Sequence, residues 1–445
     1  MTRDLNKGSI GRNLIYFSLP FLLSYFLQTL YGLADLFIAG QFNGADVITA
    51  VSVGSQLMHM VTVMIVGLAN GATVMIAQSV GAKDGKSAAR SIANSAVVFV
   101  VFSLVVSAVL VALINPIISV LSVPSESIEQ TKIYLLVCFA GIPFITAYNV
   151  ISSIFRGLGD SKSPMYFIAA ACVVNIAADV LFIGVLDLKA LGAALGTVIS
   201  QAISVIISLV VILKRGVGVK ISKSDFVPRA DVCRKIFAVG VPVAVQDGFI
   251  QVSFLVITAI ANSRGIEIAA AVGIVEKIIS IMFLFPSSML SAVSVIAAQN
   301  VGANLHDRAK KTLRYAVIFV SAAGLVISLA TQLCAPWLVS LFTSDSNVVV
   351  YGEQYLRAYV FDCIFAGIHF SCSGYFIAYQ KSVLSFVHNL LSVLLVRIPF
   401  AYFATLWFPE TLWQMGVAAP AGSLLSCIIC AIFLAVFFTP QRPAQ

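Results

Sequence analysis

Residues 13–42 read NLIYFSLPFLLSYFLQTLYGLADLFIAGQF, one long apolar run with a proline near one end and a carboxylate near the other. An ionisable side chain inside a membrane-spanning helix costs at least ~2.5–3.5 kcal/mol on insertion scales, so we expect Asp35 to bind something or to face water. Pro20 removes one backbone donor from the helix and allows it to bend. This stretch therefore predicts a bendable membrane helix that carries an acid.

The composition extends this prediction to the whole chain. Of the 445 residues, 60% are hydrophobic and 10% are charged, whereas soluble proteins are about 25% charged. The cysteines lie mostly inside apolar runs, which favours small hydrophobic residues over a disulfide or metal framework. We expect an all-α polytopic membrane protein with about 20 apolar residues per span. The twelve expected helices are 13–42, 47–79, 91–117, 131–156, 164–187, 190–213, 235–261, 268–298, 312–333, 353–378, 383–407 and 414–438.

The basic residues predict the orientation of these helices. A net charge of +8 would by itself suit a nucleic-acid partner. Most of the 27 Lys and Arg residues, however, fall on the side that holds both termini, and the opposite side has only Lys132, Lys189, Arg264 and Arg357. The positive-inside rule then places both termini in the cytoplasm. The basic balance indicates membrane orientation and no nucleic-acid partner.

The chain also repeats itself. Leu19-Pro20 aligns with Val241-Pro242, and AQSVGAKD (77–84) aligns with AQNVGANL (298–305) at nearly the same offset. Six helices precede the longest polar stretch and six follow it, so both halves enter from the same side and the repeat is parallel. Duplicated bundles of this kind are a transporter architecture with the substrate path between the halves. The expected lobes are residues 1–214 and 235–445, joined by a cytoplasmic linker at 215–234.

Oxygen-bearing side chains share one depth in the first half. Asn175 and Asp179 are four residues apart and so lie on one helix face. At 1.5 Å per residue, Asp35 lies ~10 Å and Asp179 ~12 Å from the outer ends of their helices, with Thr197 ~10 Å into the next helix and Tyr134 near the outer rim. No basic residue is expected inside these helices. The set suits Na⁺ or a shared proton, against the alternative that the acids only hydrogen-bond to neighbouring helices.

The second half differs, because the positions that match Asp35 and Asp179 hold isoleucines. Its embedded charges of both signs can pair with one another or line a substrate path, and both readings stay open. These charges are Asp247, Glu276, Asp362, Lys277 and Arg397. On the first helix, Gln28 and Tyr31 are further candidates for substrate lining, against ordinary packing contacts.

Together these features resemble the multidrug and toxic compound extrusion (MATE) transporters of the prokaryotic DinF-like branch. The resemblance rests on Pro20, Asp35, AQSVGAKD, FRGLGDSKSP (155–164) and the duplicated halves. It implies a V-shaped protein of two six-helix lobes in a prokaryotic plasma (inner) membrane, exporting amphipathic, often cationic compounds in exchange for Na⁺ or H⁺. It also implies helix bending at Pro20 and a cation site at Asp35, Asn175, Asp179 and Thr197 with Tyr134 nearby. Asp247 and Asp362 lie on the helices that carry a second site in the NorM-like branch but are out of register.

We therefore expect a cation-coupled antiporter that works by alternating access, with the coupling ion and a cationic substrate competing for the same acids. We expect a monomer whose partners are lipids and small amphipathic molecules, with no cofactor besides the coupling ion. The alternative is a flippase for a lipid-linked precursor, which would use basic cavity residues such as Arg397 and Lys277. An enzyme is not expected, because the sequence has no H-E-x-x-H or G-x-S-x-G motif.

Overall fold

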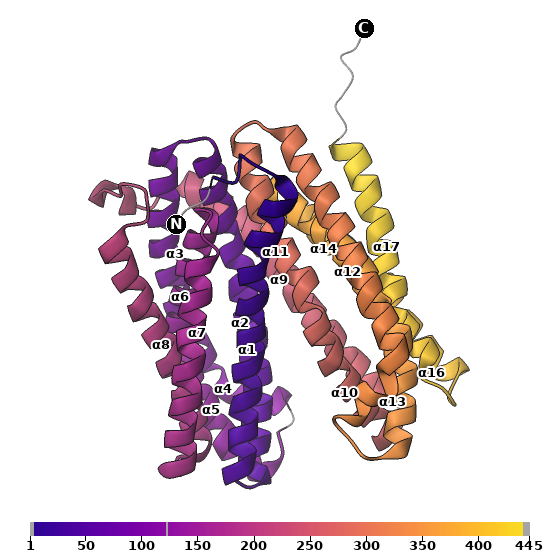
Figure 1. Cartoon of the computed structure of the whole chain (residues 1–445). Helices are drawn as coiled ribbons and strands as arrows, with labels where there is room; N and C mark the ends of the chain where they lie inside the picture. The colour runs from indigo at the N-terminus through magenta and orange to yellow at the C-terminus, as the bar shows by residue number, and fades with distance from the viewer. Residues whose placement is uncertain (1–3, 122, 439–445) are drawn as a thin grey trace. The chain divides into compact units, whose positions relative to one another are not determined.

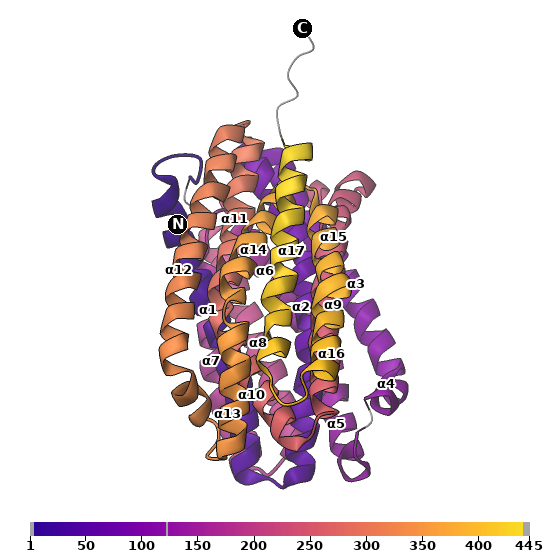
Figure 2. The ribbon, with the colours of Figure 1, turned by 90° about the vertical axis from the view of Figure 1, so that its right-hand side faces the viewer.

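The computed structural model describes residues 4–121 and 123–438, which are helical and contain no strand. Figures 1 and 2 show the helices from two sides. The first half contains α1 (Ile10–Phe42), α2 (Ala45–Gly81), α3 (Gly85–Ala112), α4 (Ile114–Val120), η1 (Ser125–Ser127), α5 (Ile128–Ala140), α6 (Ile142–Gly157), α7 (Lys162–Asp179), η2 (Val180–Val185) and α8 (Lys189–Arg215). The linker helix η3 (Lys223–Phe226) precedes α9 (Ala230–Asn262), α10 (Ile266–Met282), α11 (Leu284–Gly302), α12 (His306–Ser340), α13 (Ser346–Tyr359), α14 (Asp362–Ala378), α15 (Ser382–Ser392), η4 (Val393–Arg397), α16 (Ile398–Trp407) and α17 (Trp413–Phe437).

These helices match the expected twelve spans. Among the described residues, ten helical segments are long and apolar enough to cross a membrane. Two more spans form if each bent helix pair counts as one, since Ser125–Ala140 meets Ile142–Gly157 at 46° and Ser346–Tyr359 meets Asp362–Ala378 at 42°. The expected boundaries agree to within about five residues except in three spans: α3 begins before residue 91 and the end of its span is the separate helix α4, α12 extends beyond both ends of 312–333, and α13 begins before residue 353. The all-α polytopic fold is confirmed.

The backbone repeats as the sequence does. The two bent spans break at Gly141 and at Val360–Phe361, which are matched positions of the halves. Lys83 and Asn304, also matched, adopt φ values of 57° and 58°. Non-glycine residues rarely enter this left-handed region, so its recurrence at matched positions is independent support for duplication. The halves differ elsewhere, because α2 is unbroken whereas its counterpart is divided at Phe283 into α10 and α11.

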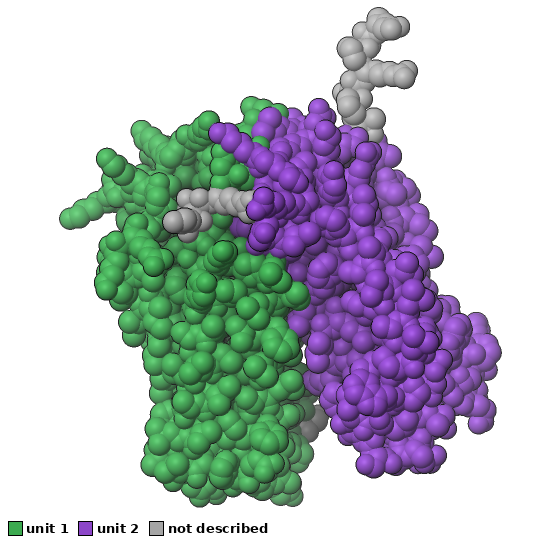
Figure 3. All heavy atoms as spheres, in the orientation of Figure 1, with its two compact units in different colours: residues 1–6, 19–244, 302–304 green, residues 7–18, 245–301, 305–445 purple. Residues whose placement is uncertain are grey.

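Internal contacts divide the chain into two compact units, coloured separately in Figure 3. Unit 1 consists of Leu19–Ala244 with the short segments before Lys7 and at Gly302–Asn304. Unit 2 consists of Lys7–Ser18, Val245–Val301 and the chain from Leu305 onward. The divisions fall inside α1 and α9, close to the matched prolines Pro20 and Pro242. The lobe boundaries 1–214 and 235–445 stay a prediction.

Unit 1 is built by close helix packing. Helix α2 packs against α3, α5, α6 and α8, and α7 packs along α8. A Cβ atom at Gly71 of α2 would contact the backbone carbonyl of Ile236 in α9, and one at Gly240 would contact the carbonyl of Leu68 in α2. Glycine at both positions therefore lets the two backbones touch, as small residues do in membrane helix pairs.

Unit 2 packs in the same manner around α12, α13, α14 and α17. Helix α12 lies against α13 and α14, and α17 contacts α13, α14, α15 and α16. Its apolar core gathers Val272, Val275, Leu356, Tyr359 and Met415, all almost fully buried. Each unit thus supplies a rigid helical frame in which polar side chains can be held away from lipid.

A candidate cation site and a second polar cavity

The side chains expected to form the cation site meet inside unit 1. The Thr197 hydroxyl of α8 donates to the Asp35 carboxyl of α1 at 3.3 Å. The Asp35 carboxyl also lies close enough to the side chains of Asp179 and Asn175 in α7 to interact with both. Asp35 is 4% exposed, Asn175 1% and Asp179 0%. The structure thus brings together polar side chains from three helices, while their role as a cation site stays a prediction.

Most polar atoms of this cluster have no partner within the chain. One oxygen of Asp35, both carboxyl oxygens of Asp179 and both polar atoms of the Asn175 amide are buried without a hydrogen bond to any described residue. Leaving such a group unpaired costs about 1–3 kcal/mol. A carboxylate can only accept hydrogen bonds, so two adjacent carboxylates repel unless a proton or a cation lies between them. The arrangement suits a shared proton or a small hard cation such as Na⁺.

Local backbone features position Asp179. It is the last residue of α7, and the chain continues into the π-helical segment η2. π-Helical turns inside helices are frequent at functional sites. A Cβ atom at Gly196 of α8 would contact the Asp179 carboxyl oxygen, so glycine at this position makes room for the acid. Sequence reasoning missed Gly196, because one glycine among several in a membrane helix gives no signal.

Tyr134 borders the site without a direct hydrogen bond to the acids. It is 2% exposed in α5, and its ring lies against Gly54 of α2, where a Cβ atom would meet the ring. It interacts electrostatically with both Asp35 and Asp179. A role for Tyr134 in cation binding stays a prediction.

The other expected residues of α1 are also placed by the structure. Tyr31 lies one helical turn before Asp35 and packs against a buried cluster that includes Tyr148 and Phe167. Gln28 is half-buried. Pro20 lies within a continuous α1, and its carbonyl accepts a hydrogen bond from the Ser24 hydroxyl at 2.7 Å. Substrate lining by Gln28 and Tyr31 and bending at Pro20 stay predictions.

One base of the first half is buried within unit 1, which the sequence did not predict. Arg156 belongs to the last turn of α6, which continues to Gly157, and it is only 8% exposed. Its guanidinium donates to the Ser153 hydroxyl at 2.8 Å and lies over the Phe21 ring at 5.8 Å. Phe21 is about 21 Å along α1 from Asp35 at 1.5 Å per residue. No base is among the groups that act on Asp35 or Asp179, so the acids still lack a nearby counter-ion among the described residues.

Unit 2 contains a cavity of about 60 Å³ with both charges in its wall. Arg397 donates to the Tyr359 hydroxyl at 2.6 Å, and its guanidinium lies 4.7 Å from the Phe254 ring centre. Asp362 is 1% exposed, and one of its oxygens and Arg397 Nε have no hydrogen-bond partner among the described residues. The lining residues are Ile250, Phe254, Phe283, Asp362, Ala366, His369, Phe370, Asn389, Ser392, Val393, Arg397 and Ser423.

The remaining charges of unit 2 are only partly brought together. Glu276 accepts a hydrogen bond from Thr258 at 3.3 Å and acts electrostatically on Arg397. Asp247 is half-buried in α9, and no charged group acts on it. Among the described residues, no direct ion pair joins any two of the embedded charges of this half. Arg397 is still coupled electrostatically to Asp362 and Glu276. Packing and charge pairing on one side, and substrate lining by Asp247, Asp362 and Arg397 on the other, therefore both stay predictions.

Sequence reasoning also missed a pair of histidines beside this cavity. The rings of His369 and His388 are 5.5 Å apart, and both side chains are buried. His388 lies between the Ser373 hydroxyl at 2.9 Å and the Ser426 hydroxyl at 3.3 Å. The two histidines lie on successive spans with no ligand-like spacing, so only the fold could bring them together.

A metal framework has no support in the described part of the chain. No group of three or more His, Cys, Asp or Glu side chains there could hold a metal ion, and all eight cysteines are free. This observation does not bear on the cluster of Asp35, Asn175, Asp179 and Thr197, because an amide and a hydroxyl supply half of its ligands.

The internal repeat also appears when the chain is compared with known proteins. The MatE family model matches twice, at residues 20–181 and 242–403, so each match begins at one of the paired prolines. The chain is 31% identical to the "Probable multidrug resistance protein YpnP" of Bacillus subtilis, over 97% of this chain and 96% of that one. It is 25% identical to "Probable multidrug resistance protein YoeA" of the same organism, over 96% and 94% of the two chains.

Solved structures agree in fold. A structure described as the outward-facing conformation of a multidrug resistance MATE family transporter of the MOP superfamily superposes with a TM-score of 0.89, at 21% identity and over 97% of each chain. The crystal structure of MATE in complex with MaL6 gives a TM-score of 0.90, at 21% identity and over 96% of each chain. With the family model matching both halves, the chain belongs to the MatE family of membrane transporters.

Proposed function

We propose that this protein is an antiporter that exports amphipathic, cationic small molecules in exchange for H⁺ or Na⁺ by alternating access. The observation that carries the proposal is the contact between Asp35 and Asp179, two buried acids whose oxygens have almost no partner within the chain. Relatives named as multidrug resistance proteins support export of drug-like molecules. The DinF-like branch, a cytoplasmic position of both termini and a monomeric state are parts of the same proposal.

The acid pair would couple the two movements by competition. With a proton or Na⁺ bound, the cluster of Asp35, Asn175, Asp179 and Thr197 is neutralised and loses its attraction for a cationic substrate. Without it, the uncompensated carboxylates attract a cation, because no base acts on either acid. Since Asp35 is on α1 and Asp179 on α7, binding also ties two helices together. Bending of α1 at Pro20 would then depend on what the site holds.

The test is transport by the purified full chain in liposomes. We expect ethidium to move against its gradient only when an inward pH or Na⁺ gradient is imposed, and the effective ion identifies the coupling ion. Liposomes without protein and protein without a gradient are the controls. Ethidium movement at the same rate with no ion gradient would indicate a passive channel and contradict the proposal.

The flippase alternative is not favoured. It needs a basic cavity for an anionic head group, and the cavity beside Arg397 is only about 60 Å³ and also holds Asp362. We expect cationic aromatic dyes to be exported faster than anionic dyes of similar size. Equal or faster export of the anionic dyes would restore the alternative and direct attention to Arg397.

A further inference from the structure

The linker between the two halves forms a cavity of about 550 Å³ at the water-facing end of unit 1. One wall is the first two turns of α3, with Gly85, Lys86 and Arg90, and the other is the linker segment from Gly218 to Arg229. The linker joins the end of α8 to the start of α9. The cavity therefore lies at the ends of three helices that are long and apolar enough to span a membrane.

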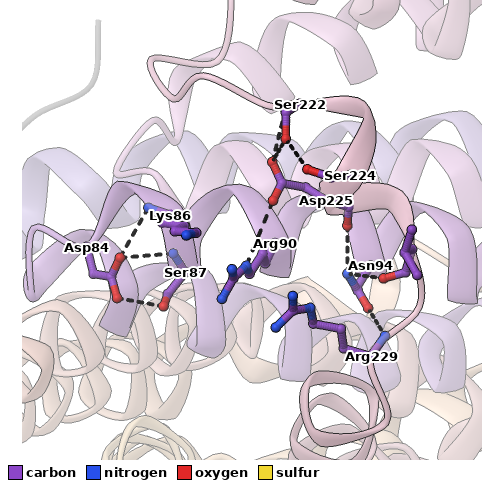
Figure 4. Close-up of polar contacts among 10 residues, drawn as sticks. Asp84, Lys86, Ser87, Arg90, Asn94, Ser222, Ser224, Asp225 and Arg229 are labelled. Carbon is purple, nitrogen blue, oxygen red and sulfur yellow. Dashed lines mark hydrogen bonds and ion pairs between the residues drawn. The ribbon is translucent and has the colours of Figure 1, made fainter.

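Specific hydrogen bonds hold the linker against α3, as Figure 4 shows. The buried Asn94 side chain of α3 donates to the Asp225 carbonyl at 2.9 Å and accepts from the Arg229 backbone amide at 2.7 Å. The Asp225 carboxyl accepts from the Ser222 amide at 2.9 Å and from the Ser222 hydroxyl at 2.7 Å. These contacts place Arg229 at the cavity, so the site is built by the fold and not by a flexible loop.

The cavity wall carries a marked excess of positive charge. Lys86, Arg90, Lys220 and Arg229 line it, and Asp225 is the one acid in the lining. Asp225 Oδ1 lies 3.9 Å from Arg90 Nε, and hydrogen bonds from Ser222 hold the pKa of Asp225 below its usual range. Lys86, Lys220 and Arg229 form no ion pair with any described residue. Both Arg90 and Lys86 act electrostatically on Asp225, so a single acid stands against four cations in the cavity wall.

The first turn of α3 does not itself supply the anion site. Asp84 already accepts hydrogen bonds from the amides of Lys86 and Ser87 at 3.1 Å and 3.0 Å. The charge of the side chains is what the cavity offers to a ligand, because the Ser222 hydroxyl already donates to Asp225 and the Ser224 hydroxyl lies 2.8 Å from that of Ser222. Clustered Lys and Arg side chains suit the oxygens of a phosphate group.

We propose that this cavity binds the phosphate group of an anionic phospholipid. Its position at the ends of α3, α8 and α9 brings it to head-group depth, and basic pockets beside membrane helices are typical sites for anionic lipid head groups. A volume of about 550 Å³ exceeds the needs of a bare phosphate and leaves room for the glycerol portion of the head group.

The test compares two triple variants of the full chain with equal loss of charge. Lys86→Gln/Lys220→Gln/Arg229→Gln removes three of the four cations that line the cavity and leaves the contact of Arg90 with Asp225 intact. Lys214→Gln/Lys223→Gln/Lys235→Gln removes three nearby basic residues that do not line the cavity. Retention of phosphatidylglycerol or phosphatidylcholine by the detergent-purified proteins is measured by native mass spectrometry.

We expect the cavity variant to lose about tenfold or more in phosphatidylglycerol affinity, the control variant to stay near wild type, and phosphatidylcholine binding to be weak throughout. Equal losses in both variants, or none in the cavity variant, would overturn the proposal. A different result would assign the cavity to a free phosphate and contradict the lipid assignment. In that case soluble glycerol phosphate would raise the thermal midpoint of the wild type but not of the cavity variant, and the wild type would show no preference for phosphatidylglycerol.

Discussion

Asp179 can lie against α8 because residue 196 has no side chain. The carboxyl oxygen occupies the place that a Cβ atom of residue 196 would take, and Thr197, the next residue, donates to Asp35. Two neighbouring positions of α8 therefore serve the two acids in different ways. Glycine makes space for one acid, and the threonine hydroxyl orients the other.

Gly196→Ala tests this packing. We expect loss of gradient-driven efflux together with a modest loss of stability, because overpacking a buried position typically costs about 1–3 kcal/mol. Gly273→Ala in α10 is the control, since nothing lies within 4 Å of its Cβ position. Dye efflux from proteoliposomes and thermal unfolding of the purified proteins give the two readings. Wild-type efflux by Gly196→Ala would show that the acid does not need this space.

The sequence was sufficient to predict the acid cluster but not its surroundings. Helix periodicity and a rise of 1.5 Å per residue bring Asp35, Asp179 and Thr197 to one depth, and such depth arguments need only helix lengths. The burial of Arg156 depends on how far α6 extends and on the Phe21 ring of another helix. Contacts between helices of this kind have no signature in a single sequence.

At the scale of the elements, α1 is the helix that holds the acid, the proline and the division between the units. Its N-terminal part, Lys7–Ser18, groups with unit 2 by internal contacts, and the part from Leu19 onward groups with unit 1. Pro20 lies two residues beyond that division. A proline removes one helical hydrogen bond and so weakens the helix at the point where its two parts have different neighbours.

Pro20→Ala is expected to slow turnover and leave equilibrium cation binding largely unchanged. Alanine is favoured over proline inside a helix by about 3 kcal/mol, so a bend at this position becomes more costly while Asp35 is untouched. Initial efflux rates and ²²Na⁺ or proton binding at equilibrium separate the two effects. Turnover equal to wild type would rule out bending at Pro20 as a transport step.

The negative charge of Asp225 helps to hold the linker in place. Hydrogen bonds from Ser222 lower the pKa of Asp225 in the folded protein. The ionised carboxyl therefore stabilises the linker fully above the usual Asp pKa, and this contribution is lost as the pH falls through the lowered value. Asp225→Asn removes the charge at neutral pH, and we expect faster hydrogen exchange of the linker amides around Ser222.

Asp231→Asn is the matched control, because Asp231 is exposed at the start of α9 and does not line the cavity. The linker amides of the Asp231→Asn variant should exchange hydrogen at the wild-type rate. Protection of the Ser222 amide that is equal in all three proteins would mean that the capping contacts do not hold the linker.

For the whole molecule, the duplicated sequence predicted the twelve spans and the parallel repeat because both depend on hydropathy and spacing. The breaks at Gly141 and Phe283 were not predicted, since apolar residues continue across them and hydropathy does not register a change of helix direction. Arg3 and Arg442, which contribute to the predicted orientation, lie outside the described residues. Orientation rests on the remaining basic residues and needs its own test.

Single cysteines in a cysteine-free background provide that test in intact cells. We expect a cysteine at Asp187 or Glu410 to react with an impermeant thiol reagent added outside, and one at Lys220 or Lys310 to react only after the cells are opened. All four positions are in exposed segments of the structure, so accessibility within the protein does not limit the reaction. Labelling of both sets from the same side would contradict the parallel arrangement of the two halves.

The most direct measurement is gradient-driven dye efflux by Asp35→Asn in proteoliposomes. Removing a buried charge that has no nearby counter-ion among the described residues should not destabilise the fold, so expression and the thermal midpoint should stay near wild type. We expect coupled efflux to fall to the level of protein-free liposomes, with Asp179→Asn behaving alike, Thr197→Ala less affected, and the exposed Asp187→Asn near wild type. Full efflux by Asp35→Asn under an imposed gradient would contradict the assignment of this cluster as the coupling site.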